Sequence, residues 1–197
     1  MNFEPLDNLI DLILEQPNVP YFFIAGGAIK SNYLNKEIYD YDLFSPEPKQ
    51  LHKILSVVLG DSLYEDGVWF YKYKDAHVSL AECPETDADK TISEFDFADI
   101  AVAYDSSKKL HEHDLWKHSI DTKTINYIYP KEKSNPRVQA SLIRVMLRLK
   151  DGWSIDAQTA ANFVSSKLAK WQATKFESGK LGKRKEIFDS LNKKCNY

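Results

Sequence analysis

The chain has 197 residues and a formal net charge of −3, with 28% charged, 43% hydrophobic and 13% aromatic residues. These values are typical of a globular protein and exclude a disordered chain. The two cysteines, Cys83 and Cys195, are too few and too far apart to indicate a disulfide scaffold or a zinc site. The sequence shows neither a secretory signal nor an apolar run of membrane-spanning length, so we expect a cytoplasmic protein that does not bind a membrane.

The charges divide the chain into two parts. Residues 1–130 hold 11 basic and 23 acidic side chains, whereas residues 131–197 hold 15 basic and 6 acidic ones. We predict a core at 1–130 and a basic helical region at 131–197. If the protein binds RNA or tRNA, the basic region is the expected contact surface. The alternative is that its lysines are solvated side chains on exposed helices.

The first elements in the chain are a helix and a strand. Apolar residues recur at helical spacing over 5–16, and an apolar strand follows at 21–25 after two prolines. The strand leads directly into Gly26 and Gly27.

This glycine pair opens a second helix, predicted at 27–35. Glycine allows backbone to approach a ligand closely, and the free N–H groups of a helix N-terminus suit phosphate. Gly26 and Gly27 are therefore candidates for a phosphate cradle. Lys30 lies on the same helix and is a candidate contact to a triphosphate.

Asp40 and Asp42 follow in a second apolar stretch. Side chains at positions i and i+2 of a strand lie on the same face, so the two carboxylates are predicted to point the same way. Such a pair can hold a divalent cation, Mg²⁺ or Mn²⁺, together with substrate phosphates. The alternative is two solvated acids on an edge strand.

The remaining core elements alternate between helices and strands. Proline punctuation and periodicity predict helices at 49–59, 87–93 and 114–120, and strands at 68–73, 77–82, 98–104 and 124–129. Between them, His111 and His113 form an His-x-His cluster, which can bind metal on a strand. We favour a flexible surface loop there.

From residue 135 the pattern is helical. Apolar residues form one stripe at Val138, Leu142, Val145, Met146 and Leu149. Arg137, Arg144 and Arg148 lie beside this stripe. Arginine suits phosphate contacts through its planar fork, so these three are candidate nucleotide-binding residues. Ion pairing with the acidic core is the alternative for Arg144 and Arg148.

Three segments together resemble one family. Gly26-Gly27, twelve further residues and then Asp40-x-Asp42 are similar to the signature of the DNA polymerase beta-type nucleotidyltransferase superfamily. Within it, the chain resembles the head domain of bacterial-type CCA-adding tRNA nucleotidyltransferases and poly(A) polymerases. The segments 94–105 and 135–156 are similar to that family's next two motifs.

The resemblance implies an α/β (α+β) fold, with a mixed sheet flanked by helices and a short helical C-terminal part. It also implies metal-dependent transfer of a nucleoside monophosphate from an NTP, such as ATP, to an acceptor hydroxyl on RNA, a protein or a small molecule. Asp40 and Asp42 would hold the metal. Because the region after the core is short, a minimal enzyme of the kind met in phages and toxin–antitoxin systems fits better than a full CCA-adding enzyme.

The sequence departs from the family at two motifs. Ser93-Glu94-Phe95 stands where the family has two arginines before an Asp, and Ser134-Asn135 stands where it has Glu-Asp. A third catalytic carboxylate is expected from a neighbouring strand, where this chain has Ser79. We assign that role to Asp96, with Asp99 and Glu82 as alternatives. The alternative function is a catalytically inactive member of the fold that binds nucleotide, nucleic acid or a protein partner.

Overall fold

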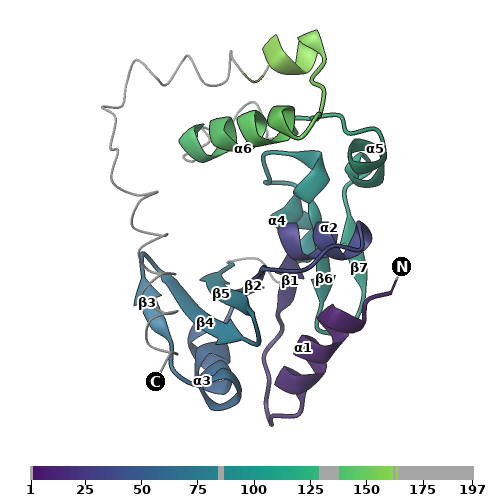
Figure 1. The fold of residues 1–197 in the computed structure, drawn as a ribbon. Helices are drawn as coiled ribbons and strands as arrows, with labels where there is room; N and C mark the ends of the chain where they lie inside the picture. Colours follow the sequence, from purple (N-terminus) through teal and green to yellow (C-terminus); the bar gives the residue numbers. More distant parts are fainter. Residues whose placement is uncertain (1, 84–86, 129–137, 162, 164–197) are drawn as a thin grey trace.

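The computed structural model describes residues 2–83, 87–128, 138–161 and 163 (Figure 1). Within them, seven strands form one sheet in the order β3-β4-β5-β2-β1-β6-β7. Strands β2 and β5 run parallel, and every other neighbouring pair is antiparallel. This mixed sheet with flanking helices confirms the predicted fold class. The strand bounds are β1 Phe23–Ala25, β2 Asp40–Ser45, β3 Leu63–Glu65, β4 Val68–Tyr73, β5 Ala76–Glu82, β6 Val102–Asp105 and β7 Leu110–Glu112.

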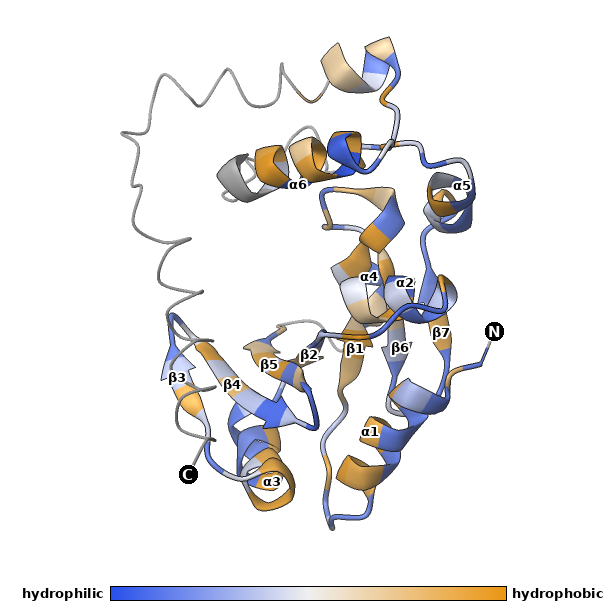
Figure 2. Ribbon diagram, viewed as in Figure 1, coloured by the Kyte–Doolittle hydropathy of each residue, from blue (hydrophilic) through white to orange (hydrophobic). Residues whose placement is uncertain are grey.

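One face of the sheet is covered by helices α1 (Glu4–Leu14), α2 (Gly27–Tyr33) and α3 (Pro48–Leu59). Their apolar sides pack against alternate strand residues to form the main hydrophobic core, which also takes in α5 (Trp116–Asp121). β1 lies near the middle of this sheet and is hydrophobic along its length (Figure 2). Since β1 is buried on both faces, the Gly26-Gly27 turn directly follows a strand that is held in the core.

The opposite face is only partly covered by a helix. The short helix α4 (Ala88–Ile92) packs over the β1 and β6 end of the sheet, in a second core cluster that includes Phe23, Ala25 and Ala103. The face of β2, β5 and β4 on this side holds polar side chains, which are described below.

Helix α6 (Val138–Lys150) turns its polar side inward. Ser141 and Arg148 are buried, whereas Leu142, Met146 and Leu149 of the predicted apolar stripe are 45% to 62% exposed. Of the stripe residues whose side chains are described, only Val145 is therefore packed. The physical reason is that two buried carboxylates of the core lie opposite the arginines and need cationic partners.

Several local predictions differ from the structure. The strand expected at 98–104 begins only at Val102, because residues 98–100 form the 3-10 helix η1 (Ala98–Ile100). His111 is not in a surface loop: it lies on β7 and is buried. The strand expected at 124–129 is reduced, over its described residues, to isolated bridges at Thr124 and Tyr127. The edge strand β3 was not predicted.

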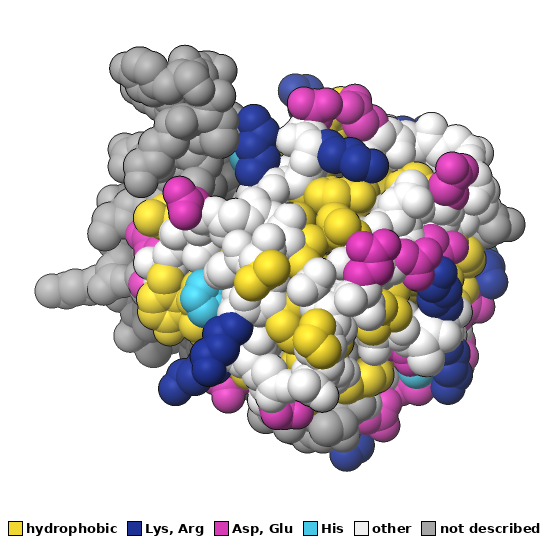
Figure 3. All heavy atoms as spheres, turned by 90° about the horizontal axis from the view of Figure 1, so that it is seen from below, with side chains coloured by type: hydrophobic (Ala, Val, Ile, Leu, Met, Phe, Trp, Pro, Cys, Tyr) yellow, Lys and Arg dark blue, Asp and Glu magenta, His cyan; other side chains and the backbone are white. Residues whose placement is uncertain are grey.

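The molecular surface seen from below mixes charges of both signs around a band of hydrophobic side chains (Figure 3). Among the described residues visible from that side, basic and acidic side chains lie close to one another. Within the part of the chain that the structure describes, no helix is both long and apolar enough to cross a membrane.

Candidate active site

The Gly26-Gly27 turn connects β1 to α2. Gly26 has φ +79° and ψ −124°, a combination that side-chain-bearing residues rarely adopt, and it is the N-cap of α2. Its N–H donates to the carbonyl of Val102 on β6 at 2.9 Å, which fixes the turn to the sheet. A Cβ added at Gly27 would meet no heavy atom within 4 Å. Space is therefore open beside Gly27, whereas Gly26 is buried.

Asp40 and Asp42 lie on β2, next to that turn. Ala25, the last residue of β1, is the register partner of Asp42. Tyr41 and Leu43 point into the main core, so both aspartates occupy the opposite face of the sheet, as the sequence predicted. The structure thus brings the glycine pair and the two carboxylates together at one end of two adjacent strands.

The charge of Asp42 acts on Asp40. Burial, and then the negative charge of Asp42, raise the pKa of Asp40 above its ordinary value. Asp40 nonetheless keeps exposed surface, so a solute can reach it. A divalent cation would relieve the repulsion of such a pair, and the two carboxylates suit a magnesium-type ion that takes its other ligands from substrate and water. Among the described residues, no group of three or more His, Cys, Asp or Glu side chains could hold a metal on its own.

Ser79 occupies the neighbouring-strand position where a third carboxylate was expected. It is the register partner of Asp42 on β5, and its hydroxyl donates to Oδ1 of Asp42 at 2.6 Å. Glu82 is also on β5, but it is three residues further along and so belongs to the other face of the sheet. Its side chain does not share a face with Asp42.

Asp96 lies in the loop beside the glycine turn, but its side chain points to α6. The carboxylate is 6% exposed and accepts hydrogen bonds from the Ser141 hydroxyl at 2.7 Å and from Arg144 at 2.9 Å. The adjacent Phe95 ring lies 3.8 Å from the position that a Cβ on Gly26 would take. The catalytic role of Asp96 stays a prediction, as does the nucleotide-binding role of Arg144.

Asp99 is fully buried and holds two cations. Arg148 donates to it through two nitrogens at 2.9 Å each, and Lys30 pairs with the same carboxylate. The Lys30 ammonium also lies 4.3 Å from the centre of the Trp153 ring. Burial is the largest influence on Lys30 and lowers its pKa, while the charge of Asp99 opposes that effect. In this arrangement α2, η1 and α6 are tied together by one buried ionic cluster.

The structure therefore places Lys30 and Arg148 in ion pairs. For Arg148, as for Arg144, ion pairing was the alternative to nucleotide binding that the sequence analysis gave. Their roles in nucleotide binding stay predictions. Arg137 lies outside the described residues. A pocket of about 430 Å³ between the N-terminus, α2 and β7 is lined by none of the predicted site residues.

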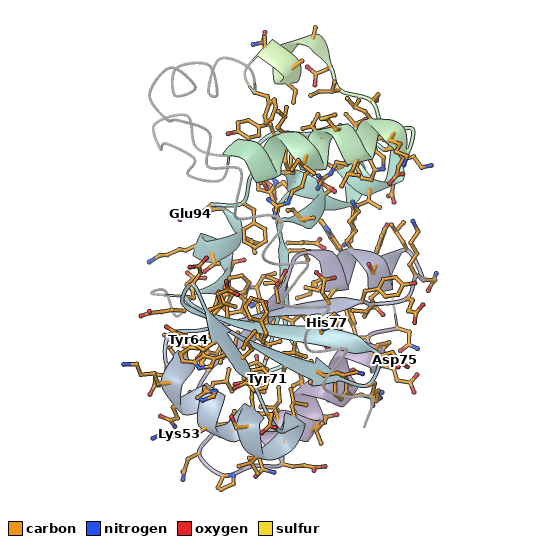
Figure 4. The ribbon with its side chains drawn as sticks, turned by 60° about the vertical axis from the view of Figure 1, so that its left-hand side comes forward. Lys53, Tyr64, Tyr71, Asp75, His77 and Glu94 are labelled. Atoms are coloured by element: carbon orange, nitrogen blue, oxygen red, sulfur yellow. The ribbon has the colours of Figure 1, made fainter. Side chains whose placement is uncertain are left out.

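Two further polar residues, which the sequence did not single out, lie on the same sheet face as the carboxylates. His77 on β5 is the register partner of Asp40, and Lys72 on β4 is the register partner of His77. Figure 4 shows His77 near the turn that carries Asp75, and Tyr71 closer to α3. The strand alternation was visible in the sequence, but the parallel pairing of β2 with β5 was not, and only that pairing places His77 beside Asp40.

Solved structures share this fold. One is a CCA-adding enzyme in complex with CTP, with a TM-score of 0.69 and 13% identity; the match covers 87% of this chain and 45% of that one. The Thermotoga maritima CCA-adding enzyme complexed with tRNA gives a TM-score of 0.66 at 13% identity, covering 84% of this chain and 42% of the enzyme. A tRNA-processing enzyme gives 0.62 at 16% identity, covering 82% and 46% of the two chains.

These similarities show that the chain has the nucleotidyltransferase fold found in tRNA-processing enzymes. The chain spans less than half the length of each of these three structures. No protein-family model matches the sequence, and no curated protein matches it significantly.

Proposed function

We propose that this protein is a metal-dependent nucleotidyltransferase that moves a nucleoside monophosphate from an NTP to an acceptor hydroxyl. The observation that carries the proposal is the meeting of the Gly26-Gly27 turn with Asp40 and Asp42 at one end of strands β1 and β2. A phosphate cradle beside a carboxylate pair would position the substrate and help to neutralise charge in nucleotidyl transfer. The shared fold with tRNA nucleotidyltransferases supports the proposal.

In the proposed reaction the acceptor oxygen forms a bond to the α-phosphorus of the NTP. The bond between that phosphorus and the oxygen bridging to the β-phosphate breaks, and pyrophosphate leaves. The hydroxyl proton passes to solvent. Gly26 and Gly27 would form the cradle for the departing phosphates. The Gly26 N–H is held by Val102, so Gly26 would shape the turn, and the backbone N–H of Gly27, which has open space beside it, would face the phosphates.

Asp40 and Asp42 are the residues that would hold the metal, Mg²⁺ or Mn²⁺. The pKa of Asp40 is raised by burial and by the Asp42 charge, and a bound cation would counter both effects. When bound, the ion would supply charge neutralisation at the transferred phosphate. Ser79, which donates to Asp42, would orient that carboxylate.

For substrates we propose an NTP and an RNA or tRNA acceptor. Structures of the same fold have been solved with CTP, with ATP and with tRNA. Proteins and small molecules are the alternative acceptors, and they fit the proposal of a minimal, phage- or toxin-like enzyme located in the cytoplasm. The basic region 131–197 is the proposed RNA contact, with Arg137, Arg144 and Arg148 as its nucleotide-side residues.

The test is incubation of the purified protein with Mg²⁺ or Mn²⁺, each α-³²P-labelled NTP, and either total tRNA or cell extract. Asp40→Asn and Asp42→Asn variants remove each charge at nearly constant shape, and Asp75→Asn makes the same change in the exposed β4–β5 turn. We expect label transfer by the wild type and by Asp75→Asn, and none by the two site variants. Equal transfer by all four proteins would contradict the assignment of the site.

One observation favours the alternative of an inactive binding module. Among the described residues, no third carboxylate stands on the sheet face beside Asp42, because Ser79 takes that place and Asp96 and Asp99 are paired with arginines. An inactive module would bind NTP in a calorimeter without transferring label. Binding of NTP that is lost in Asp40→Asn, with no transfer by the wild type, would select this alternative.

A further inference from the structure

We propose that Phe95, backed by Phe44, forms an aromatic wall on which the base of the bound nucleotide stacks. This inference rests on the proposed function, because it assigns the nucleoside side of the same site. It gives a role to the segment 93–95, where the chain departs from the family that it resembles. The glycine turn and the two aspartates leave this side of the nucleotide unassigned.

Phe95 lies over the glycine turn. Its ring is 3.8 Å from the position that a Cβ on Gly26 would take. The loop after α4 fixes the backbone there, because the N–H of Phe95 donates to the carbonyl of Ile92 at 3.1 Å. Figure 4 labels the preceding residue, Glu94. Phe95 is only partly buried, whereas Gly26 is buried, so Phe95 covers the turn and still offers surface to a ligand.

Phe44 connects this ring to the carboxylates. It lies on β2 two residues after Asp42, so it shares a sheet face with Asp42 and Asp40. Its ring centre is 6.5 Å from that of Phe95, and it stacks at 5.5 Å on Phe23 of β1. Phe44 is also only partly buried. This face of the sheet therefore changes along β2 from two carboxylates to a pair of aromatic rings.

That change matches the two ends of a nucleotide. The phosphates and their metal ion are charged, whereas the base is a flat ring that stacks on aromatic side chains. The Phe95 ring lies beside the residue that precedes Gly27, so a nucleotide with its phosphates at Gly27 brings its base within reach of the ring. Because every base has such a stacking face, the wall predicts affinity for the nucleoside part without a strict choice of base.

The test compares a nucleotide with its phosphates alone. Calorimetry measures the affinity of ATP, CTP and inorganic tripolyphosphate in the presence of Mg²⁺. Phe95→Leu should weaken ATP binding about tenfold, and CTP binding less because the smaller base has less stacking contact to lose. Tripolyphosphate binding should be unchanged. Phe95→Tyr keeps the ring and should bind all three as the wild type does.

Tyr21→Leu is the matched control. Tyr21 belongs to the same second core cluster, with its ring 6.0 Å from that of Phe23, but it lies before β1, at the opposite end of that strand from the glycine turn. Its loss should leave ATP affinity unchanged. A ring that only seals the core would behave differently: ATP binding weakened equally in Tyr21→Leu and Phe95→Leu, or ATP and tripolyphosphate binding weakened equally in Phe95→Leu, would overturn the proposal.

A second variant decides the question if Phe95→Leu does not fold. Phe95→Trp places an indole in the wall, in addition to the four native tryptophans. ATP should quench the fluorescence of this variant more than that of the wild type, whereas tripolyphosphate should quench both proteins to the same extent. Equal quenching of the two proteins by ATP would overturn the wall.

The two proposals fail separately. If the wild type binds ATP but transfers no label, the proposed function falls, and the calorimetry and quenching of the Phe95 variants still decide on the wall. If label is transferred and Phe95→Leu binds ATP as tightly as the wild type does, the wall alone falls. Failure of the wild type to bind any NTP would overturn both.

Discussion

The hydroxyl of Ser79 donates a 2.6 Å hydrogen bond to Oδ1 of Asp42 across the parallel β2–β5 pair. A hydroxyl adds no negative charge to the face that already carries Asp40 and Asp42. The site is thus a two-carboxylate arrangement in the described part of the chain, with Ser79 as an orienting neighbour.

A carboxylate at position 79 should strengthen metal binding. Ser79→Asp places a third acid beside Asp42, so without metal we expect a lower melting temperature from like-charge repulsion. With Mg²⁺ or Mn²⁺ the variant should gain more thermal stability than the wild type does. The measurement is the melting temperature with and without each ion. Ser79→Asn is the neutral control, and an equal metal response of all three proteins would argue against an ion at this face.

The two glycines of the cradle should respond differently to alanine. Gly26→Ala forces a side chain into a backbone conformation with φ +79°, which should cost about 1–3 kcal/mol of unfolding free energy. Gly27 is helical, and a Cβ added there would meet no atom within 4 Å. Gly27→Ala should therefore retain the fold or stabilise it by about 0.5–1 kcal/mol. Its new methyl group would occupy the ligand side of the turn, and NTP affinity should fall. Chemical denaturation and calorimetry check the pair. Undiminished NTP affinity in Gly27→Ala would remove the turn from the binding site.

Asp99 should matter more to stability than either of its partners. Asp99→Asn leaves both Arg148 and Lys30 without their carboxylate in a buried place, which should cost about 3 kcal/mol or more. Arg148→Met should cost less, because Lys30 still neutralises Asp99. Urea unfolding followed by tryptophan fluorescence measures the unfolding free energy of both variants. A larger loss in Arg148→Met than in Asp99→Asn would show that Lys30 alone does not neutralise Asp99.

His111 should make stability depend on pH. Its ring contacts Asp105 at 3.0 Å and Asp89 at 3.1 Å. Burial, the largest single influence, acts to lower the pKa of His111, but the hydrogen bonds and charges of the two carboxylates together raise it above 6.5. Because the folded pKa is the higher one, the stabilisation is complete below about pH 6.5 and is lost as pH rises through the folded pKa.

Melting temperatures of the wild type and His111→Gln over this pH range test that dependence. The difference between the two proteins should be largest in mild acid and should shrink toward alkaline pH. A difference that stays constant or grows with pH would contradict the assigned ion pairs.

The local pattern of the sequence was enough to predict the glycine turn and the shared face of Asp40 and Asp42, while the mixed sheet with flanking helices was implied by the family resemblance. The first two depend on neighbours in the chain: an apolar strand ending in two glycines, and an i, i+2 spacing on a strand. The surroundings of the site were harder to predict. Which strand lies beside β2 is a matter of tertiary pairing, so the positions of Ser79, His77 and Lys72 were not readable.

Buried charge was the other source of error. A helical wheel of α6 shows an apolar stripe, yet Ser141 and Arg148 are buried and Val145 is the one buried residue among the stripe side chains that the structure describes. The prediction lacked the positions of Asp96 and Asp99, whose burial demands cations from the facing helix. In the same way, η1 replaces the first residues of an expected strand and turns the Asp99 carboxylate toward α2 and α6.

The most direct test of the account is which phosphate of the NTP reaches the acceptor. The wild-type protein is incubated with total tRNA, divalent metal and either α-³²P- or γ-³²P-labelled CTP and ATP, and the radioactivity is followed into acceptor and pyrophosphate. Nucleotidyl transfer predicts α-label in the acceptor and γ-label in pyrophosphate, with both lost in Asp42→Asn. Label from the γ-position in the acceptor, or α-label transfer that survives Asp42→Asn, would contradict the account.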